Sequence, residues 1–349
     1  MLYIHQTSCI SPQQTFAGAA IDLLQEAVNN KMQVVEPSYE GIPTGILRRM
    51  GKAIRIGVGT ALPLIRANSH PIDGIIIGTA NGGMEDCIKF LNQIIDYKEG
   101  MLTPTNFVQS TTNAIAAQIA LLSSNKGYNA THVQRGLAFE NALLDAMMLL
   151  KENSAANYLA GGVDEISAYN YNIDYLDGWF KKEPLAAKDL YTSGTPGSLA
   201  GEGSATFLVN AVKEGALAAV TGIQLLHTAN EGLAADQLKL FLQKQLPAGE
   251  KIDLLLSGED GDSRMQPYYT AFETVVGTAS NVARFKHMTG EYATASAAAL
   301  WLACNILQQQ QLPAHMIKSQ TASTKDFRRI LICNTHKGRQ HSFILVEKP

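Results

Sequence analysis

Apolar residues recur in this chain at two spacings, and each spacing predicts one kind of secondary structure. The segment IDGIIIG, from Ile72 to Gly78, predicts a buried strand, and a Gly-rich turn follows it. The next apolar positions recur at helical spacing and are Met84, Cys87, Ile88 and Leu91. Because the same order of strand, turn and helix returns along the chain, the pattern predicts a layered α/β fold.

The segment from Asn129 to Glu165 is the one around which the rest of the chain is organised. Small and polar residues lead to Arg135 and Gly136, a helical apolar pattern follows, and LAGG then predicts the end of a buried strand. A tight turn thus delivers the chain to the N-terminus of a buried helix, where free N–H groups and the helix dipole stabilise a thiolate or an alkoxide. No cysteine stands in this turn, so a core helix packed on a sheet is the simpler interpretation.

The second half of the chain repeats the pattern of the first. The strand and turn IDLLLSGEDGD resemble IDGIIIGTANGG. We therefore expect a duplicated α/β unit, with an N-terminal half over residues 1–185 and a C-terminal half over residues 186–349. Between the two patterns, residues 170–198 contain aromatic residues, Gly and Pro without a clear period, which predicts a long surface excursion.

Composition and charge favour a subunit interface and argue against nucleic acid or a membrane as a partner. Of the 349 residues, 46% are hydrophobic and 17% are charged, which is typical of a layered fold or of an oligomer with a large subunit interface. The net charge is −3 and the sequence has no run of Lys or Arg, so we expect no nucleic-acid partner. No stretch approaches the roughly 20 apolar residues that a membrane-spanning helix needs, so we expect no membrane insertion.

The cysteines and the glycine-rich turns argue against a metal or a nucleotide cofactor. The four cysteines are scattered without a CxxC or CxxxH pair, which predicts a reducing, cytoplasmic setting and no zinc site. The turn GTANGG lacks both the Lys-Ser/Thr of a P-loop and the full GxGxxG spacing. We therefore expect neither a metal nor a cofactor.

Four motifs in the correct order carry a resemblance to a known family. They are IGTANGG, LAGGVDE, AGEGSATFLV and RFKHMTGEYATASAAA. In turn, these resemble the first strand-turn, the strand after the nucleophile helix, the GEGAG-type segment and the SxKxxxGHxxxAAG motif of the β-ketoacyl synthases. The resemblance is to the divergent, chain-length-factor-like subunits of aryl polyene and flexirubin-type pathways. It implies a thiolase-like, five-layered α-β-α-β-α fold from two duplicated halves.

The resemblance also implies that the catalytic positions of the family are changed here. In the family, a Cys thiolate accepts an acyl chain from an acyl carrier protein, and two His residues assist decarboxylation of the malonyl unit. Aligning RGL with the family's SGL places Val133 at the Cys position, and an alignment that suits LAGG moves it toward Gly136. The first His position falls at Gly258 and the second at Glu291, while Lys286 keeps the place of the family's lysine.

The residues at and around these positions predict a different chemistry. An acidic turn over residues 258–262 cannot replace a neutral imidazole that donates a hydrogen bond to an enolate. An ionised Glu291 would repel the malonyl carboxylate, whereas a protonated one would donate a hydrogen bond if burial raised its pKa. Lys286 is interpreted as a solvated charge before a helix, and Arg135 and Glu140 as a pair that locks the elbow.

Three functions are compatible with these expectations. The first is a non-catalytic ketosynthase-like subunit, of the chain-length-factor type, that pairs with an active ketosynthase and shapes its product tunnel. The second is an acyltransferase or condensing enzyme of the same fold with another nucleophile or base, for which His132, Glu259 and Glu291 are the candidates. A homodimeric acyl-binding protein is a third interpretation. The expected partners are an active ketosynthase or a second copy of the chain, and an acyl carrier protein.

The stretch from Met101 to Ala114 matches the segment that lies at the dimer interface in the related families. Its apolar residues Phe107 and Val108 are bounded by polar ones. They are candidates either for ordinary interface packing or for the floor of the partner's acyl tunnel.

Overall fold

A computed structural model describes this chain over residues 1–349, apart from residues 17, 19–20, 23, 279 and 322–325. The strands of the first half are β1 (Leu2–Ile10), β3 (Gly74–Gly78), β4 (Tyr128–His132), β5 (Tyr158–Asp164) and β7 (Gly203–Asn210). Those of the second half are β8 (Ala218–His227), β9 (Leu254–Ser257), β10 (Asn281–Arg284), β11 (Ile317–Ser319), β12 (Arg329–His336) and β13 (Gln340–Glu347). The two-residue strands β2 (Lys31–Met32) and β6 (Ala200–Gly201) pair with each other.

The two sets of strands repeat one pattern of pairing, as a duplicated unit requires. In the first half, β7 pairs antiparallel with β1 and β5, and β3 pairs parallel with β5 and β4. In the second half, β13 pairs antiparallel with β8 and β12, and β9 pairs parallel with β12 and β10. The halves join where residues 2–4 of β1 pair with residues 218–220 of β8. Within the described residues, this makes one 11-stranded sheet in the order β11-β10-β9-β12-β13-β8-β1-β7-β5-β3-β4.

The pairing changes from the first set of strands to the second between Asn210 and Ala218. The boundary expected after residue 185 falls before β7, which still belongs to the first set. As a division between folding units, that boundary stays a prediction.

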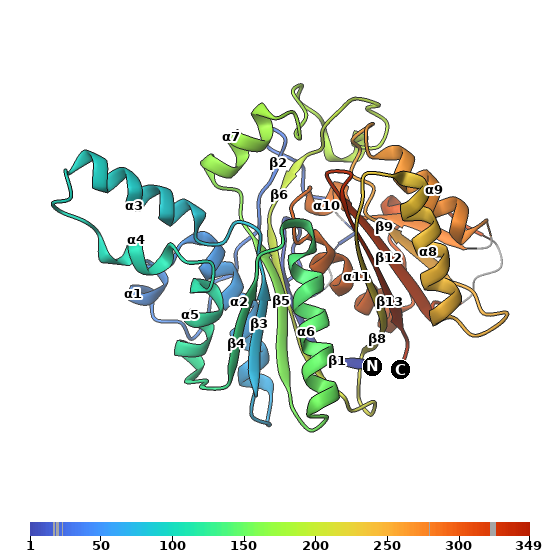
Figure 1. Cartoon of the computed structure of the whole chain (residues 1–349), viewed down its shortest axis with the longest axis horizontal. Coiled ribbons are helices and arrows are strands. Elements are labelled where there is room, and N and C mark those ends of the chain that lie inside the picture. The colour runs from blue at the N-terminus through green and yellow to red at the C-terminus, as the bar shows by residue number, and fades with distance from the viewer. Residues whose placement is uncertain (17, 19–20, 23, 279, 322–325) are drawn as a thin grey trace.

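Helices cover the two halves of the sheet in three layers (Figure 1), which confirms the expected α-β-α-β-α order. The first outer layer contains α2 (Lys52–Ala67) and α5 (Ala114–Ser123), the middle layer α6 (Ala138–Glu152) and α11 (Ala295–Gln309), and the second outer layer α8 (Glu231–Gln245) and α9 (Gln266–Val276). Successive strand residues face opposite layers. In β3, Ile75 and Ile77 pack toward α2 and α5, whereas Ile76 packs toward α6 and α11. The continuous apolar run of this strand is therefore buried on both faces.

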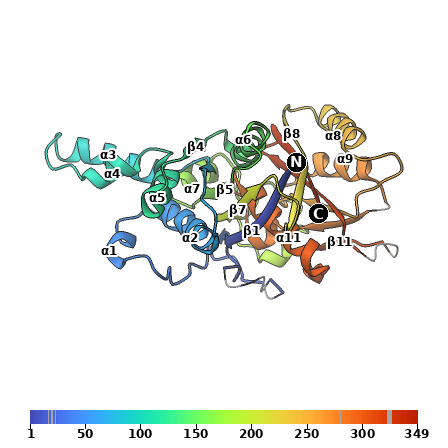
Figure 2. The same ribbon diagram turned by 90° about the horizontal axis from the view of Figure 1, so that it is seen from below.

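Shorter elements complete the chain. They are the helices α1 (Thr44–Leu47), α3 (Met84–Asp96), α4 (Pro104–Gln109), α7 (Ala168–Leu176) and α10 (Lys286–Thr289), and the 3₁₀ turns η1 (Arg135–Leu137), η2 (Ala187–Asp189) and η3 (Ala314–Met316). Both views show α3 and α4 as a hairpin that extends away from the body of the molecule (Figures 1 and 2). No described helix is both long enough and apolar enough to cross a membrane.

The expected surface excursion over residues 170–198 is wrong in part. Its first residues belong to α7, which begins after Ser167, whose hydroxyl accepts a hydrogen bond from the N–H of Asn170. Farther along, Ala187 and Leu190 are fully buried and pack with Met32. These apolar side chains are spaced too irregularly to give a helical or strand period, which is why the pattern alone does not reveal their burial.

Candidate functional site

The chain encloses a cavity of about 140 Å³ among residues that follow the carboxyl ends of β3, β5, β9 and β12. In α/β sheets this end of the strands is where ligands bind. The cavity is lined by Ala80, Asn81, Met84, Arg135, Asp164, Glu165, Ile166, Asn170, Tyr171, Ile173, Asp174, Trp179, Phe180, Ala200, Gly201, Asp260, Asp262, Met265, Glu291, Tyr292, Ala293, His336 and Lys337. These residues come from both halves of the chain, so the duplicated fold itself builds the site.

The elbow before α6 supplies the wall at Arg135. This residue has φ of 50°, a left-handed conformation that is uncommon for a residue with a Cβ atom and is often found at functional sites. Gly136 follows, and a Cβ atom there would lie 2.2 Å from the Cβ atom of His336. His336 therefore packs directly on this turn and leaves no room for a side chain at Gly136. Val133, two residues before Arg135, is 44% exposed and does not line the cavity. Its match to the family's Cys position stays a prediction.

The acidic turn after β9 directs two of its carboxylates to the cavity and a third to ion pairs elsewhere. Asp260 and Asp262 line the cavity, whereas Glu259 forms ion pairs with Arg284 at 3.3 Å and Lys318 at 2.7 Å. Gly258 lies against Asn334, whose Oδ1 atom would be 2.5 Å from an added Cβ atom. The match of Gly258 to a family His position stays a prediction, and the carboxylates that reach the cavity from this turn follow it by two and four residues.

Lys286 and Glu291 form an ion pair at the cavity wall. Lys286 is 0% exposed, so its interpretation as a solvated charge is wrong. Burial by itself raises the pKa of Glu291, but Lys286 and His336 lower it by more, and the net pKa lies below its ordinary value. Glu291 is therefore ionised at neutral pH, and the protonated form considered from the sequence is disfavoured. Its second oxygen lies 3.4 Å from Nδ1 of His336.

The pKa of Asp260 is shifted in the opposite direction from that of Glu291. Burial, together with the negative charge of Glu291, raises the pKa of Asp260 to about 8. Its Oδ1 atom accepts a hydrogen bond from the N–H of Asp262 at 3.0 Å. Asp260 and Glu291 thus line one cavity in different protonation states, which is the usual arrangement of acid and base groups in functional sites.

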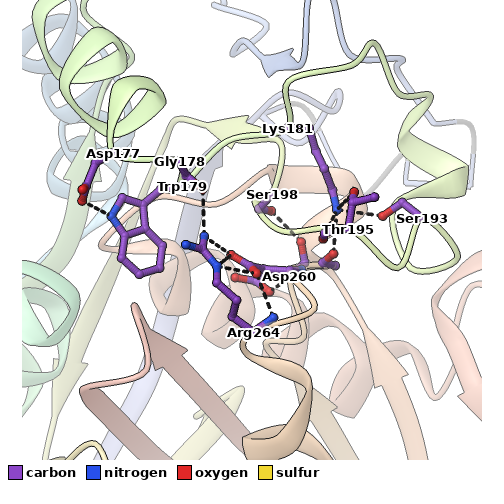
Figure 3. Close-up of polar contacts among 11 residues, drawn as sticks. Asp177, Gly178, Trp179, Lys181, Ser193, Thr195, Ser198, Asp260 and Arg264 are labelled. Atoms are coloured by element: carbon purple, nitrogen blue, oxygen red, sulfur yellow. Dashed lines mark hydrogen bonds and ion pairs between the residues drawn. The ribbon is translucent and has the colours of Figure 1, made fainter.

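The loop after α7 is fastened to the acidic turn, as Figure 3 shows. The Nζ atom of Lys181 donates hydrogen bonds to Ser193, to two oxygens of Thr195 and to the carbonyl of Gly261, at 2.7 to 3.0 Å. The hydroxyl of Ser198 donates to the carbonyl oxygen of Asp260 at 2.6 Å. These bonds hold the loop, and with it Trp179 and Phe180, over the cavity.

Asp164, in the cavity lining, ties the two halves together. One oxygen accepts hydrogen bonds from the N–H groups of Ala80 and Asn81, at 2.9 and 3.1 Å, and from the hydroxyl of Thr79. The other accepts from the N–H and the hydroxyl of Thr294, just before α11. The carboxylate is thus fully used in positioning the turn after β3 and the start of α11.

Two other side chains proposed from the sequence, His132 and Glu140, are not in the cavity lining. His132 bonds to Asp145 at 2.9 Å through Nε2. Glu140 is buried and accepts a hydrogen bond from Ser342 at 2.7 Å. Arg135 makes no ion pair among the described residues, so the expected pairing of Arg135 with Glu140 is wrong, because the two side chains point to different surroundings.

Phe107 and Val108 lie on α4, in the projecting hairpin. They are 61% and 67% exposed, and the ring of Phe107 lies 5.3 Å from that of Phe90. Neither lines the cavity. Their role at an interface or a partner's tunnel stays a prediction.

The cysteines do not supply a thiolate to the site. Burial raises the pKa of the Cys9 and Cys304 thiols to about 12 and that of Cys333 well above its ordinary value. Cys87 is on α3, in the projecting hairpin, and none of the four cysteines is in the cavity lining. Within the described part of the chain, no group of three or more His, Cys, Asp or Glu side chains is placed to hold a metal ion.

Comparison with known proteins places this geometry in a family. Residues 24–219, more than half of the chain, match the family model for the β-ketoacyl synthase N-terminal domain. The chain belongs to the β-ketoacyl synthase family. A search of curated protein sequences gave no match.

Solved structures of ketosynthases share the fold of this β-ketoacyl synthase-like chain over its whole length. The ishigamide ketosynthase/chain length factor matches with a TM-score of 0.79 at 16% identity, covering 100% of this chain and 99% of that one. The ketosynthase ApeO in complex with its chain length factor ApeC, from Xenorhabdus doucetiae, matches with a TM-score of 0.76 at 14% identity, covering 100% and 98%. A type II polyketide synthase acyl-carrier protein in complex with its ketosynthase, AntDE:AntF, gives 0.78 at 14% identity, covering 100% and 99%. These likenesses establish the thiolase-like fold.

The sequence contained a signal for the residues that motif comparison missed. Asp164, Asp260 and His336 each lie at or just after the carboxyl end of a strand, in the motifs GGVDE, SGEDGD and NTHKG. The carboxyl ends of parallel strands meet at one edge of a sheet, and β9 and β12 pair in parallel, so the turns that carry Asp260 and His336 are expected to converge. Asp164 follows β5 in the other half of the sheet, and its approach to them depends on how the two halves pack. Arg135 had no such signal, because its place in the lining depends on a left-handed backbone conformation.

Proposed function

We propose that this chain is a non-catalytic subunit of the chain-length-factor type, which pairs with an active ketosynthase in polyketide or polyene biosynthesis. The observation that carries the proposal is the ion pair of Lys286 and Glu291 at the cavity wall. Decarboxylative condensation needs groups that donate hydrogen bonds to the enolate. Glu291 is an ionised carboxylate already bonded to a buried lysine, so it repels a malonyl carboxylate instead of stabilising the enolate.

The state of the thiols supports the same proposal. An acyl-enzyme thioester requires a thiolate, and thiolates are stabilised at helix N-termini or beside cations. Cys9 and Cys304 are buried with their pKa raised to about 12. The elbow before α6 offers Arg135 instead of a nucleophile.

The surface around β4 supports pairing with a second subunit. β4 is the last strand of the sheet in the described structure, so one edge of its backbone is free to bond another chain. Exposed large apolar side chains lie on the elements on this side of the molecule. They are Leu91, Ile95, Tyr97, Met101, Phe107, Val108, Leu121, Tyr128 and Val133. We assign this surface, the β4 face, to an active ketosynthase subunit, with acyl carrier protein as the donor of the growing chain in the cytoplasm.

The alternative is an acyltransferase or condensing enzyme with a different nucleophile, and one observation favours it. Of the three candidate side chains, Glu291 lines the cavity. The other two are engaged elsewhere, His132 with Asp145 and Glu259 with Arg284 and Lys318. The two functions differ in whether the chain acquires a covalent acyl group.

Two measurements test the proposal. The full chain is co-expressed with a ketosynthase that keeps the Cys and both His residues, and native mass spectrometry of the purified material is expected to show a one-to-one heterodimer. A stable homodimer with no co-purifying ketosynthase would contradict the partner assignment. Separately, the chain alone is incubated with acylated carrier protein, and intact mass spectrometry is expected to show no added acyl group. An adduct on Glu291 or His132 would establish the alternative, and one on a cysteine would contradict both.

A further inference from the structure

The cavity is lined by more acidic than basic side chains. Its carboxylates are Asp164, Glu165, Asp174, Asp260, Asp262 and Glu291, and its permanent cations are Arg135 and Lys337. A carboxyl group that has no compensating cation within the protein is available to pair with a cationic ligand.

Four of the six are compensated. Glu291 pairs with Lys286, Asp174 with Lys337 at 2.5 Å, and Asp262 with Arg264 at 2.5 Å. Asp164 accepts five hydrogen bonds, as described above. Asp260 and Glu165 remain.

Asp260 is the buried member of this pair. It is 6% exposed, its Oδ1 atom accepts one backbone hydrogen bond, and its Oδ2 atom has no hydrogen-bond partner among the described residues. The nearby cations are engaged elsewhere (Figure 3): Arg264 bonds to Asp262, and Lys181 to hydroxyl and carbonyl oxygens. No ion pair to Asp260 forms among the described residues, and a buried carboxyl group without a cation beside it is costly to ionise in the free protein and available to a cationic ligand.

Glu165 directly follows β5 and also lines the cavity. It accepts a hydrogen bond from the N–H of Ala53 at 3.0 Å and makes no ion pair with any described residue. Burial, with a further contribution from Glu85, raises the pKa of Glu165 to about 7. A second carboxyl of the same cavity therefore also lacks a cation.

Aromatic rings form part of the same lining. They are Tyr171, Trp179, Phe180 and Tyr292, and the rings of Tyr171 and Phe180 stack at 5.3 Å. Aromatic faces attract ammonium groups and also accommodate apolar bodies. The protein's own cations illustrate this, because Lys31 lies 3.7 Å from the ring centre of Tyr171 and Arg264 lies 4.3 Å from that of Trp179.

We propose that the cavity binds a small organic cation, a primary ammonium group on an aromatic or apolar body, with the ammonium group paired to Asp260. A metal ion does not fit, because the described carboxylates do not converge as a coordinating group. This site is separate from the proposed pairing with a ketosynthase and does not require it.

Binding of the ligand replaces the proton on Asp260 with the ammonium group. In the free protein, burial and Glu291 raise the pKa of Asp260 to about 8, so the carboxyl holds a proton at neutral pH. When the ammonium group binds, that proton leaves to solvent and the carboxylate pairs with the ligand. The charged and titratable groups that face Asp260 are Glu291, Lys286, Asp262, Lys181, Arg264, Tyr191 and Tyr269. Affinity is therefore expected to rise with pH up to about 8 while the amine stays protonated.

Three probes of nearly equal shape test the proposal on the full chain. Benzylammonium, benzamide and benzoate share one ring and differ in charge. Isothermal titration calorimetry is expected to show benzylammonium binding at least about tenfold more tightly than the other two, because a charge-assisted hydrogen bond contributes about that much. Titrations in buffers of different ionisation enthalpy are expected to report proton release near neutral pH.

The variant Asp260→Asn keeps the shape of the side chain and its acceptor oxygen and removes the charge. It is expected to weaken benzylammonium by about tenfold and to leave benzamide unchanged. Asp236→Asn, on the exposed face of α8, is the matched control and is expected to bind as the wild type does. Near-ultraviolet circular dichroism verifies that both variants are folded. Equal or tighter binding of benzamide or benzoate, unchanged binding in Asp260→Asn, or no binding of any probe would each overturn the proposal.

Discussion

Lys286 and Glu291 face each other across Gly290, and their ion pair is closed off from solvent on the lysine side. Gly290 makes this possible, because its φ is 69° and an added Cβ atom would lie 2.5 Å from the Cα atom of Gly201. The pair fixes the charge of the cavity wall. It also makes the stability of the fold depend on both partners.

Replacing the lysine is therefore expected to be costly. Lys286→Met leaves the buried carboxylate of Glu291 without its cation, and breaking such a pair from one side costs about 3 kcal/mol or more of unfolding free energy. The double variant Lys286→Met with Glu291→Leu is expected to recover part of this loss. Urea unfolding measures both. Lys89→Met, which removes an exposed ion pair with Glu85 on α3, is the control and is expected to cost less than about 0.5 kcal/mol. A Lys286→Met protein as stable as this control would contradict the prediction.

Asp260 gives the pH dependence an unusual sign. Its folded-state pKa is about 8, above the ordinary value of about 4, so its contribution to stability is fully present below about pH 4 and is lost as pH rises through about 8. Asp260→Asn is thus expected to gain stability relative to the wild type from about pH 5 to about pH 8, by up to a few kcal/mol. Above about pH 8, the difference in unfolding free energy between the variant and the wild type no longer changes with pH. Chemical denaturation across this range, with Asp236→Asn as the control, checks it, and a constant difference at all pH values would refute it.

The contact between Gly136 and His336 predicts a steric effect. Gly136→Ala places a Cβ atom 2.2 Å from the Cβ atom of His336, so the elbow or β12 must shift, at a cost of about 1 to 3 kcal/mol. Thermal and urea unfolding measure the loss. Gly45→Ala, where an added Cβ atom meets nothing within 4 Å, is the matched control. If both variants unfold alike, the packing of His336 on the elbow is looser than described.

The substitution Phe107→Ala tests whether this residue of the β4 face closes the acyl tunnel of the partner. If its ring closes the acyl tunnel of the partner ketosynthase, Phe107→Ala opens space there and lengthens the product without abolishing condensation. Because the side chain is 61% exposed in the single chain, the substitution is expected to change stability by less than about 1 kcal/mol. Mass spectrometry of the products of the co-expressed pair checks the chain length. Ile95→Ala, on the neighbouring helix, is the control, and an unchanged product from an intact Phe107→Ala heterodimer removes Phe107 from this role.

Much of the fold could be predicted because its core strands are continuous apolar runs. Ile75 to Ile77 and Leu254 to Leu256 are buried on both faces, and each run is followed by a glycine-containing turn. β4 is the counterexample. Its sequence YNATH is polar, and it is a strand because its backbone bonds to β3 at the edge of the sheet, where solvent satisfies the side chains.

The cavity was less predictable than the core for a related reason. Motif comparison assigned single positions such as Gly258 and Val133, whereas the side chains that reach the cavity are their neighbours Asp260 and Arg135. Which residue of a turn points inward depends on backbone angles such as the φ of 50° at Arg135. The burial of Lys286 follows from packing between the halves, which no local sequence pattern encodes.

The first strand of the chain lies between two strands that are made much later. β1 pairs with β7 and with β8, so during synthesis it must wait for residues 203–227 before either edge is covered. Contacts this distant in sequence slow folding and leave strand edges open to other chains in the meantime. A ribosome carrying the first two hundred residues would therefore display β1 without either neighbour, including its apolar residues Leu2, Ile4 and Ile10, and chaperone binding to nascent chains of that length is the consequence to look for.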